Sequence, residues 1–264
     1  MESGEAQHDP MCAPSESCRA RVSRSTPHVP TVLRFLETYR GSSCPTLSEL
    51  DSGARVVLKL RGSGNGAEAL VSEYLVNGLT QATGFPVPAP AVVQLPDSFP
   101  WRYGTDEFHD LVRKSGGPNL GLAVITGARP FPLERKARLR AALVSQIVTL
   151  DRTFSNWDRT EQSGNLLEDR DGQLHFVDHG SCRFLQEGER AALPLLPAQH
   201  CFFPRHDAFD ATWLEGIDDA LVTRVAEEIP ELWLAEIGLT RAKVSALTRA
   251  RLALARQTAS SPPP

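Results

Sequence analysis

The sequence is poor in the features that mark membrane, secreted and metal-clustered proteins. No stretch approaches the run of about 20 apolar residues that a membrane-spanning helix requires. The first residues lack the apolar core of a secretory signal. Cysteines are few and odd in number, and no two have the Cys-x-x-Cys spacing of a zinc site: Cys12, Cys18, Cys44, Cys182 and Cys201. These absences predict a cytoplasmic protein without a membrane partner or a disulfide framework.

An excess of basic residues is also lacking. Acidic residues outnumber basic ones by 32 to 28, so the formal net charge is −4. Proteins that bind nucleic acid usually present a basic surface, and we therefore expect no nucleic-acid partner.

The composition is that of a globular protein with a sizeable core. Hydrophobic residues make up 41% of the 264 positions and charged residues 23%. Residues 1–30 are polar and show no apolar periodicity, so we expect a disordered leader there, and a disordered tail over residues 258–264.

The first half of the ordered sequence is rich in predicted strands. We expect strands at residues 31–39, 88–95 and 120–127, and the clearest one at residues 54–62. Alternation in that strand places Lys59 on the face opposite Val56, Leu58 and Leu60. A glycine-rich turn, GSGNG, then leads into a helix over residues 67–83. This order predicts a small antiparallel sheet crossed by one helix, with a second, short helix near residues 106–114.

The second half is predicted to be mainly helical. Residues 134–149 carry apolar side chains at helical spacing, and residues 207–257 form helices interrupted at Pro230 and Gly238. Residues 126–132, which hold a proline-bearing linker, join the two halves. We therefore predict an α+β fold of two lobes, an N-lobe over residues 31–128 and a helical C-lobe over residues 129–257.

Three polar side chains stand out in the second half. Asp158 follows the predicted helix, Asn165 comes seven positions later, and Asp178 ends a short strand thirteen positions beyond that. Magnesium prefers such hard oxygen ligands, and phosphoryl transfer also requires a group that orients the attacking hydroxyl and a cation on the phosphates. Lys59 can supply the cation.

At these residues the sequence resembles the HipA-like kinases, which are related to protein and lipid kinases. The resemblance lies in VVLKLRGSGNGAEAL, EYLVNGLTQATGFPVPAP, GGPNLGLAVITGA, SNWDRTEQSGNLL and FVDHG. It covers most of the ordered chain and implies a kinase fold, ATP and Mg²⁺.

The resemblance also implies roles for individual residues. Lys59 is similar to the lysine that holds the ATP phosphates, and Glu73 to the carboxylate that pairs with it. Asp158 resembles the catalytic aspartate, and Asn165 and Asp178 the magnesium ligands. The phosphate-covering loop corresponds to Gly41, Ser42 and Ser43, and the hinge that meets adenine to residues 122–125, including Leu122 and Val124.

The sequence departs from the commoner protein-kinase pattern. Arg159 follows the catalytic aspartate and no His-Arg-Asp is present, the Asp-to-Asn spacing is two residues longer, and GxGxxG is missing from the phosphate loop. These departures argue against regulation through activation-loop phosphorylation and leave the magnesium site intact.

Each candidate also has a structural interpretation. Lys59 could be a solvated edge residue, Glu73 part of a solvated helix face with Asn77 and Thr80, and the two aspartates a cap and a turn. Asp151 and Asn156 are candidates for bracing the loop, and His179 for a structural neighbour of Asp178. We interpret His200 and His206 as loop histidines.

We predict an ATP- and Mg²⁺-dependent kinase that phosphorylates a hydroxyl group, with protein Ser/Thr as the first acceptor and a small alcohol or lipid as the second. The alternative from another class is a pseudokinase or nucleotide-binding scaffold. Gly62, Gly64 and Gly66 also suggest dinucleotide binding by a dehydrogenase, which would require a parallel doubly wound sheet.

Overall fold

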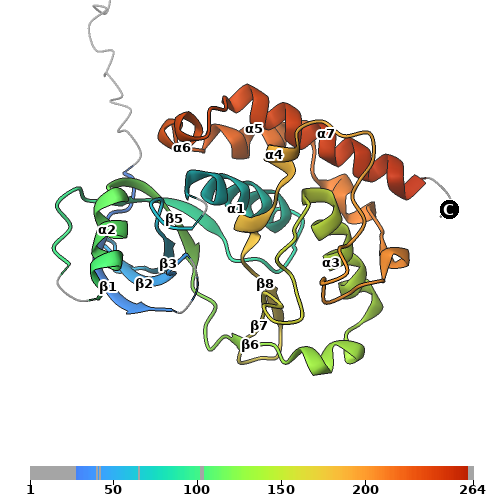
Figure 1. Cartoon of the computed structure of the whole chain (residues 1–264), viewed down its shortest axis with the longest axis horizontal. Helices are drawn as coiled ribbons and strands as arrows, with labels where there is room; N and C mark the ends of the chain where they lie inside the picture. Colours follow the sequence, from blue (N-terminus) through green and yellow to red (C-terminus); the bar gives the residue numbers. More distant parts are fainter. Residues whose placement is uncertain (1–27, 40, 42, 65, 102–103, 261–264) are drawn as a thin grey trace, which may run out of the picture.

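The chain folds into two lobes that lie side by side (Figure 1). A computed structural model describes residues 28–39, 41, 43–64, 66–101 and 104–260. Residues 1–27 of the predicted leader and residues 261–264 of the predicted tail lie outside the described residues. The predicted leader extends too far, to residue 30, because the structure describes residues 28–30 and Gln94 N donates a hydrogen bond to Pro30 O (2.8 Å).

The first lobe is built on a five-stranded antiparallel sheet. Its strands follow the order β1-β2-β3-β5-β4. The bounds are Val32–Thr38 for β1, Thr46–Leu50 for β2, Arg55–Lys59 for β3, Pro90–Leu95 for β4 and Gly117–Ala123 for β5. All of these pairs are antiparallel, which excludes the doubly wound sheet of the dehydrogenase alternative.

Alternation along β3 separates the core from the site. Val56, Leu58 and Leu60 are buried in an apolar cluster that helix α2 (Asp106–Lys114) closes with Phe108 and Val112. Thr105 caps α2 by accepting a hydrogen bond from Phe108 N (3.3 Å). Lys59 therefore projects from the other face of the strand, as the period of two predicts.

Helix α1 (Gly66–Gln81) lies between the sheet and the second lobe (Figure 1). Its apolar residues belong to a core cluster that joins the second lobe to Leu120 and Leu122 of β5, whereas the outer face of the sheet has a cluster of its own. The alternative interpretation of Glu73 as part of a solvated helix face is wrong, because Glu73, Asn77 and Thr80 are all fully buried. The spacing of apolar residues does not identify a solvent-exposed face here, because other segments cover α1 on all sides.

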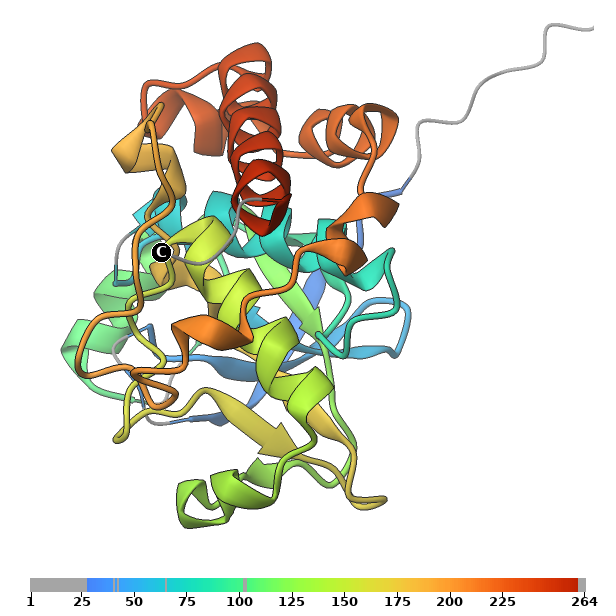
Figure 2. The same cartoon turned by 90° about the vertical axis from the view of Figure 1, so that its right-hand side faces the viewer.

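The second lobe combines helices with a small sheet. Strands β6 (Arg129–Pro130), β7 (Leu166–Glu168) and β8 (Leu174–Phe176) pair antiparallel. The helices are α3 (Ala141–Phe154), α4 (Phe184–Glu187), α5 (Asp219–Glu227), α6 (Glu231–Glu236) and α7 (Arg241–Ser260). Short 3₁₀ segments are η1 (Leu133–Arg138), η2 (His179–Ser181), η3 (His206–Ala208) and η4 (Thr212–Gly216). Figure 2 shows α3 and α7 together on the face turned away from the five-stranded sheet.

Several predicted boundaries differ from the structure. The helix expected over 134–149 is split into η1 and α3, because Leu139 between them is extended yet still packs on the core. The linker at residues 129–130 is strand β6, and the strand expected over 120–127 is β5, which starts earlier and ends at Ala123. Residues 258–260 of the tail continue α7. The division of the lobes at residue 128 stays a prediction.

None of the helices formed by the described residues is long and apolar enough to span a membrane.

Helix α6 ties the two lobes together through Trp233. The indole is fully buried, and its N–H donates a hydrogen bond to Pro118 O on β5 (2.9 Å). The ring also packs edge-on against Tyr74 of α1, with centroids 6.2 Å apart. Arg61, just after β3, pairs with Glu236 at the end of α6.

Replacing Trp233 by Ala is expected to lower the free energy of unfolding by about 3–5 kcal/mol, because a buried ring is lost. Trp233→Phe should lower the free energy of unfolding by only about 1 kcal/mol, because most of the packing is kept and one hydrogen bond is lost. Urea unfolding followed by circular dichroism measures both values. Equal losses in the two variants would contradict this role for the ring.

Candidate active site

Lys59 is the centre of the site and joins three segments of the chain. It ends β3, and its Nζ lies 2.6 Å from Glu73 Oε2 on α1 and 2.7 Å from Asp178 Oδ1 after β8. The Lys59 side chain is 9% exposed and Glu73 is fully buried, whereas the Asp178 side chain is 41% exposed. The buried ion pair therefore has one open side, at Asp178.

Charge and burial act against each other around this lysine. Burial lowers the pKa of Lys59, but the two carboxylates outweigh it and hold the pKa above its usual value. The Lys59 ammonium in turn lowers the pKa of Asp178 by more than its partial burial raises it. At neutral pH the site therefore holds an ammonium and an ionised Asp178 that faces the opening.

The segment that carries Asp178 has an unusual backbone. Asp178 is left-handed (φ 62°, ψ 58°), a conformation that aspartate tolerates better than most residues. Two residues on, a Cβ added to Gly180 would lie 3.2 Å from Ala69 Cβ and 3.5 Å from Glu73 Oε2. Only glycine lets η2 approach α1 this closely without displacing either, and that approach places Asp178 beside Lys59.

Asp158 and Asn165 lie together on the loop after α3. Asn165 Nδ2 donates to Asp158 Oδ2 and to Asp158 O, both at 3.3 Å. Asn165 is also left-handed (φ 49°), and its carbonyl accepts from Val177 N (3.1 Å), which joins this loop to the residue before Asp178. Partial burial raises the pKa of Asp158, and the Asp178 charge adds to that effect.

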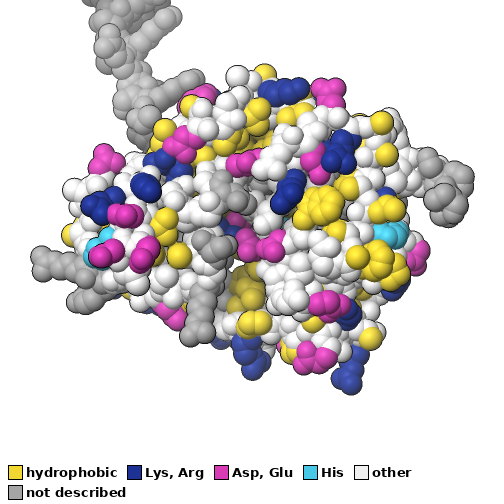
Figure 3. Space-filling model, viewed as in Figure 1, with side chains coloured by type: hydrophobic (Ala, Val, Ile, Leu, Met, Phe, Trp, Pro, Cys, Tyr) yellow, Lys and Arg dark blue, Asp and Glu magenta, His cyan; other side chains and the backbone are white. Residues whose placement is uncertain are grey.

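A cavity of about 260 Å³ connects these groups. Both lobes line it, with Ser43, Ser63 and Gly64 from the sheet side and Lys59, Glu73, Asp158, Asp178, Gly180 and Ser181 among its other walls. Figure 3 shows acidic side chains at the middle of this face, where the two lobes meet. The cavity thus presents one ammonium, three carboxylates and small side chains to a ligand.

The donor set fits a magnesium ion that is shared with phosphates. Within the described part of the chain no three His, Cys, Asp or Glu side chains converge as a self-sufficient metal site. Asp178 supplies an exposed carboxylate, and Asn165 supplies an amide oxygen while its nitrogen donates to Asp158. Magnesium is commonly held by one or two protein oxygens together with substrate phosphates and water.

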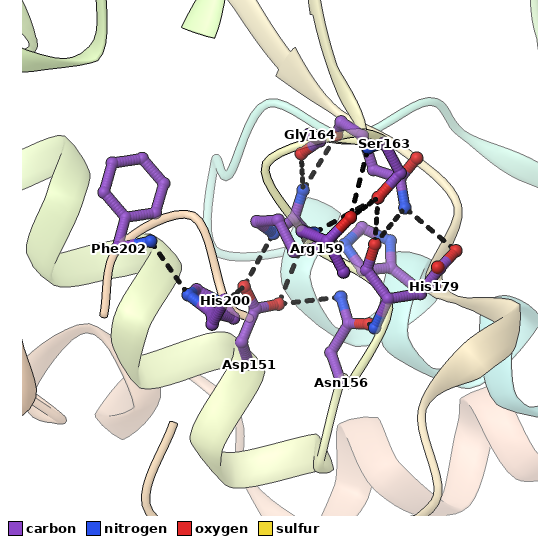
Figure 4. Close-up of polar contacts among 11 residues, drawn as sticks. Asp151, Asn156, Arg159, Ser163, Gly164, His179, His200 and Phe202 are labelled. Atoms are coloured by element: carbon purple, nitrogen blue, oxygen red, sulfur yellow. Dashed lines mark hydrogen bonds and ion pairs between the residues drawn. The ribbon is translucent and has the colours of Figure 1, made fainter. Parts of the chain in front are cut away.

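A buried cluster fixes the loop that carries Asp158 and Asn165 (Figure 4). Arg159 is fully buried, and its Nη1 donates to Asn165 O (2.8 Å) and Gly164 O (3.2 Å). Its Nε donates to Asp151 Oδ2 (2.6 Å). Asp151 also accepts from Asn156 Nδ2 (2.8 Å) and from His200 Nε2 (3.0 Å). Burial raises the pKa of Asp151, but Arg159 and His200 overcome this and hold it well below its usual range.

The structure brings most of the predicted site residues together. Lys59, Glu73, Asp158, Asp178 and Ser43 line the same cavity, and Asn165 contacts Asp158. Gly41 is exposed and is not part of the wall, and Ser42 lies outside the described residues.

The predicted hinge residues lie apart from this cavity. Leu122 is buried in β5, and Val124, just beyond the strand, is 40% exposed and lines a different hollow with Asp169 and His175. Their contact with adenine stays a prediction.

Sequence reasoning missed several residues of the site. Ser63, Gly64 and Ser181 line the cavity, and the GSGNG turn after β3 was the available signal for the first two. His200 lies outside every helix and strand that the structure describes, as interpreted, but its burial against Asp151 was not foreseen. His200 lies 49 positions from Asp151 in the sequence, and no local sequence pattern predicts a contact over such a separation. Bracing by Asp151 and Asn156 is confirmed by their contacts.

The antiparallel sheet, the helix across it and the helical second lobe define a two-lobed kinase-like fold. The fold is similar to the crystal structure of a Helicobacter pylori proinflammatory kinase, CtkA, with a TM-score of 0.54 over 84% of this chain and 94% of that chain. The two sequences are 11% identical, so the likeness shows the fold alone. No protein-family model matches the sequence, and neither does any curated protein.

Asp151→Asn is expected to destabilise the protein by about 3–5 kcal/mol at pH 7, because it leaves the buried Arg159 charge unpaired. Urea unfolding over a pH series measures the loss, and exposed Asp171→Asn is the control. The folded-state pKa of Asp151 is depressed, so its contribution is complete above the unfolded pKa of about 4 and declines as pH falls below it. The gap between wild type and Asp151→Asn should therefore narrow in acid, and a gap that widens there would contradict the assignment.

Proposed function

We propose that this chain is a kinase that transfers the γ-phosphate of ATP to a hydroxyl acceptor with the help of Mg²⁺. The observation that carries the proposal is the position of Lys59 Nζ, within 2.7 Å of both Glu73 and Asp178, in a cavity that Asp158 also lines. The kinase-like fold supports the same function. An ammonium, a metal-binding carboxylate and a separate carboxylate in one cleft are what phosphoryl transfer requires.

The residues divide the work by their environment. Glu73 is buried and holds the Lys59 ammonium, which is thereby aimed at the ATP phosphates. Asp158 has a carboxylate in the cavity wall and a raised pKa, both suited to orienting the acceptor hydroxyl and taking its proton. The hydroxyl oxygen forms a bond to the γ-phosphorus as the bond from that phosphorus to the ADP oxygen breaks, and the proton leaves toward Asp158.

Asp178 and Asn165 are the residues that would hold magnesium. The metal supplies positive charge that offsets the negative charge of the transferring phosphoryl group. Asn165 has a second task in this arrangement, because its amide nitrogen holds Asp158 in place (3.3 Å).

We infer that the acceptor is a serine or threonine of a protein and that the chain is a HipA-like kinase. The inference rests on the resemblance of the sequence segments around Lys59, Asp158 and Asp178. A small alcohol or lipid acceptor and a pseudokinase are the other outcomes that the experiments below distinguish.

Asp158→Asn is expected to lower phosphotransfer at least about 100-fold, because the amide cannot take the hydroxyl proton. Transfer of labelled γ-phosphate to protein, alcohol and lipid acceptors measures the rate and identifies the acceptor class. Asp171→Asn, on the exposed turn between β7 and β8, is the matched control and should match wild type. Equal activity of Asp158→Asn and wild type would refute the role of Asp158.

Asp178→Asn and Lys59→Met should each abolish the stabilisation by ATP and Mg²⁺ that wild type shows in thermal unfolding. Asp158→Asn should keep that stabilisation, since the acceptor carboxylate is not needed to hold the nucleotide. Wild type that binds ATP and Mg²⁺ without transferring phosphate to any acceptor would indicate the pseudokinase. Wild type that binds no nucleotide would overturn the proposed function.

A further inference from the structure

A chain of buried hydrogen bonds joins α1 to both loops of the site. Asn77, His179 and Arg159 are each fully buried. Asn77 Oδ1 lies 2.7 Å from His179 Nδ1, and His179 Nε2 lies 3.3 Å from Arg159 Nη2. Figure 4 shows His179 beside Arg159, which lies at the centre of the cluster.

The direction of each bond follows from the chemistry of its ends. Arginine can only donate, so His179 Nε2 accepts and the proton of the ring is on Nδ1. That proton is donated to Asn77 Oδ1, and Asn77 Nδ2 donates to Pro88 O (3.1 Å). The ring is neutral, because an imidazolium would have no lone pair with which to accept from Arg159. Each side-chain nitrogen and oxygen of Asn77 and His179 is therefore assigned as either a donor or an acceptor.

Every member of the chain stands next to a residue of the proposed active site. Asn77 follows Glu73 by four positions, which is one turn of α1. His179 follows Asp178 directly, and Arg159 follows Asp158 directly. A displacement of α1 along its axis would break the bond between Asn77 and His179, so the chain sets the position of Glu73 relative to both loops.

Apolar packing alone does not define this position as narrowly. Apolar contacts on α1 are non-directional, whereas a buried hydrogen bond has a preferred distance and angle, and breaking it leaves two unsatisfied polar groups. The Asn77 and His179 side chains are both fully buried. Their polar atoms are all satisfied, which makes them a specific connection.

We propose that Asn77 and His179 are positioning residues that hold Glu73, and through it Lys59, in register with the loop that carries Asp158 and Asn165. The effect on catalysis rests on the proposed function, whereas the effect on α1 does not. The residues touch neither nucleotide nor acceptor in this proposal. They act through the hydrogen-bond chain.

The first test needs no phosphotransfer activity. In ¹⁵N-labelled wild type, the histidine side-chain NMR spectrum at pH 7 should contain one ring locked in the Nδ1–H form. Asn77→Leu should remove that signature, because the ring loses the acceptor that fixes its tautomer. A spectrum in which no ring has the Nδ1–H form, or one that Asn77→Leu leaves unchanged, would overturn the proposal.

The second test measures α1 by hydrogen exchange. Thr80→Val is the matched control: Thr80 is equally buried on α1, and its hydroxyl donates only to carbonyls of that helix, chiefly Val76 O (2.6 Å). Asn77→Leu should speed exchange of the α1 amides by roughly tenfold more than Thr80→Val does. Equal effects of the two variants would overturn the coupling.

The third test asks whether Asn77 acts through Glu73. Asn77→Leu should lower kcat/KM by roughly tenfold in the wild-type background and have almost no further effect in a Glu73→Gln background, as expected when one residue works through another. Additive losses would overturn the link to Glu73. Absence of phosphotransfer in wild type would refute the proposed function, and the NMR and exchange measurements would still decide the inference.

Discussion

The site depends on one buried ammonium that two carboxylates share. Lys59 stays charged inside the protein because Glu73 and Asp178 lie within 2.7 Å of its Nζ. A buried charge without such partners would cost several kcal/mol. The close approach of η2 to α1, the glycine at position 180 and the left-handed backbone of Asp178 all serve to bring the second carboxylate to this point.

Arg159 plays a corresponding part for the loop in the second lobe. It satisfies two carbonyls of the Asn165 turn, and Asp151 balances its charge. Because the cluster is closed to solvent and nearly every polar atom in it has a partner, the loop has little freedom to rearrange. The two buried charge clusters meet at His179, which contacts Arg159 and Glu73, so the two groups of site residues share one internal framework.

The parts of this arrangement that follow local rules could be predicted from the sequence. The period of two in β3 places Lys59 opposite the apolar cluster. The residues at 158, 165 and 178 could be found because Asp and Asn carry the oxygen ligands that magnesium prefers. The burial of Glu73 and the contact of His200 with Asp151 could not be predicted. Both depend on which segments cover a helix or meet across the core, and neither produces a periodic pattern in the sequence. The break between η1 and α3 was also hidden, because Leu139 packs on the core from an extended backbone.

The way α1 is packed has a consequence for motion between the lobes. Its apolar residues share one core with the second lobe and with Leu120 and Leu122 of β5, the strand that pairs with β3, which carries Lys59. A displacement of the sheet relative to α1 would have to break this apolar packing as well as the contacts of Lys59 with both acids. The ion triad and the apolar core of α1 therefore resist the same displacement.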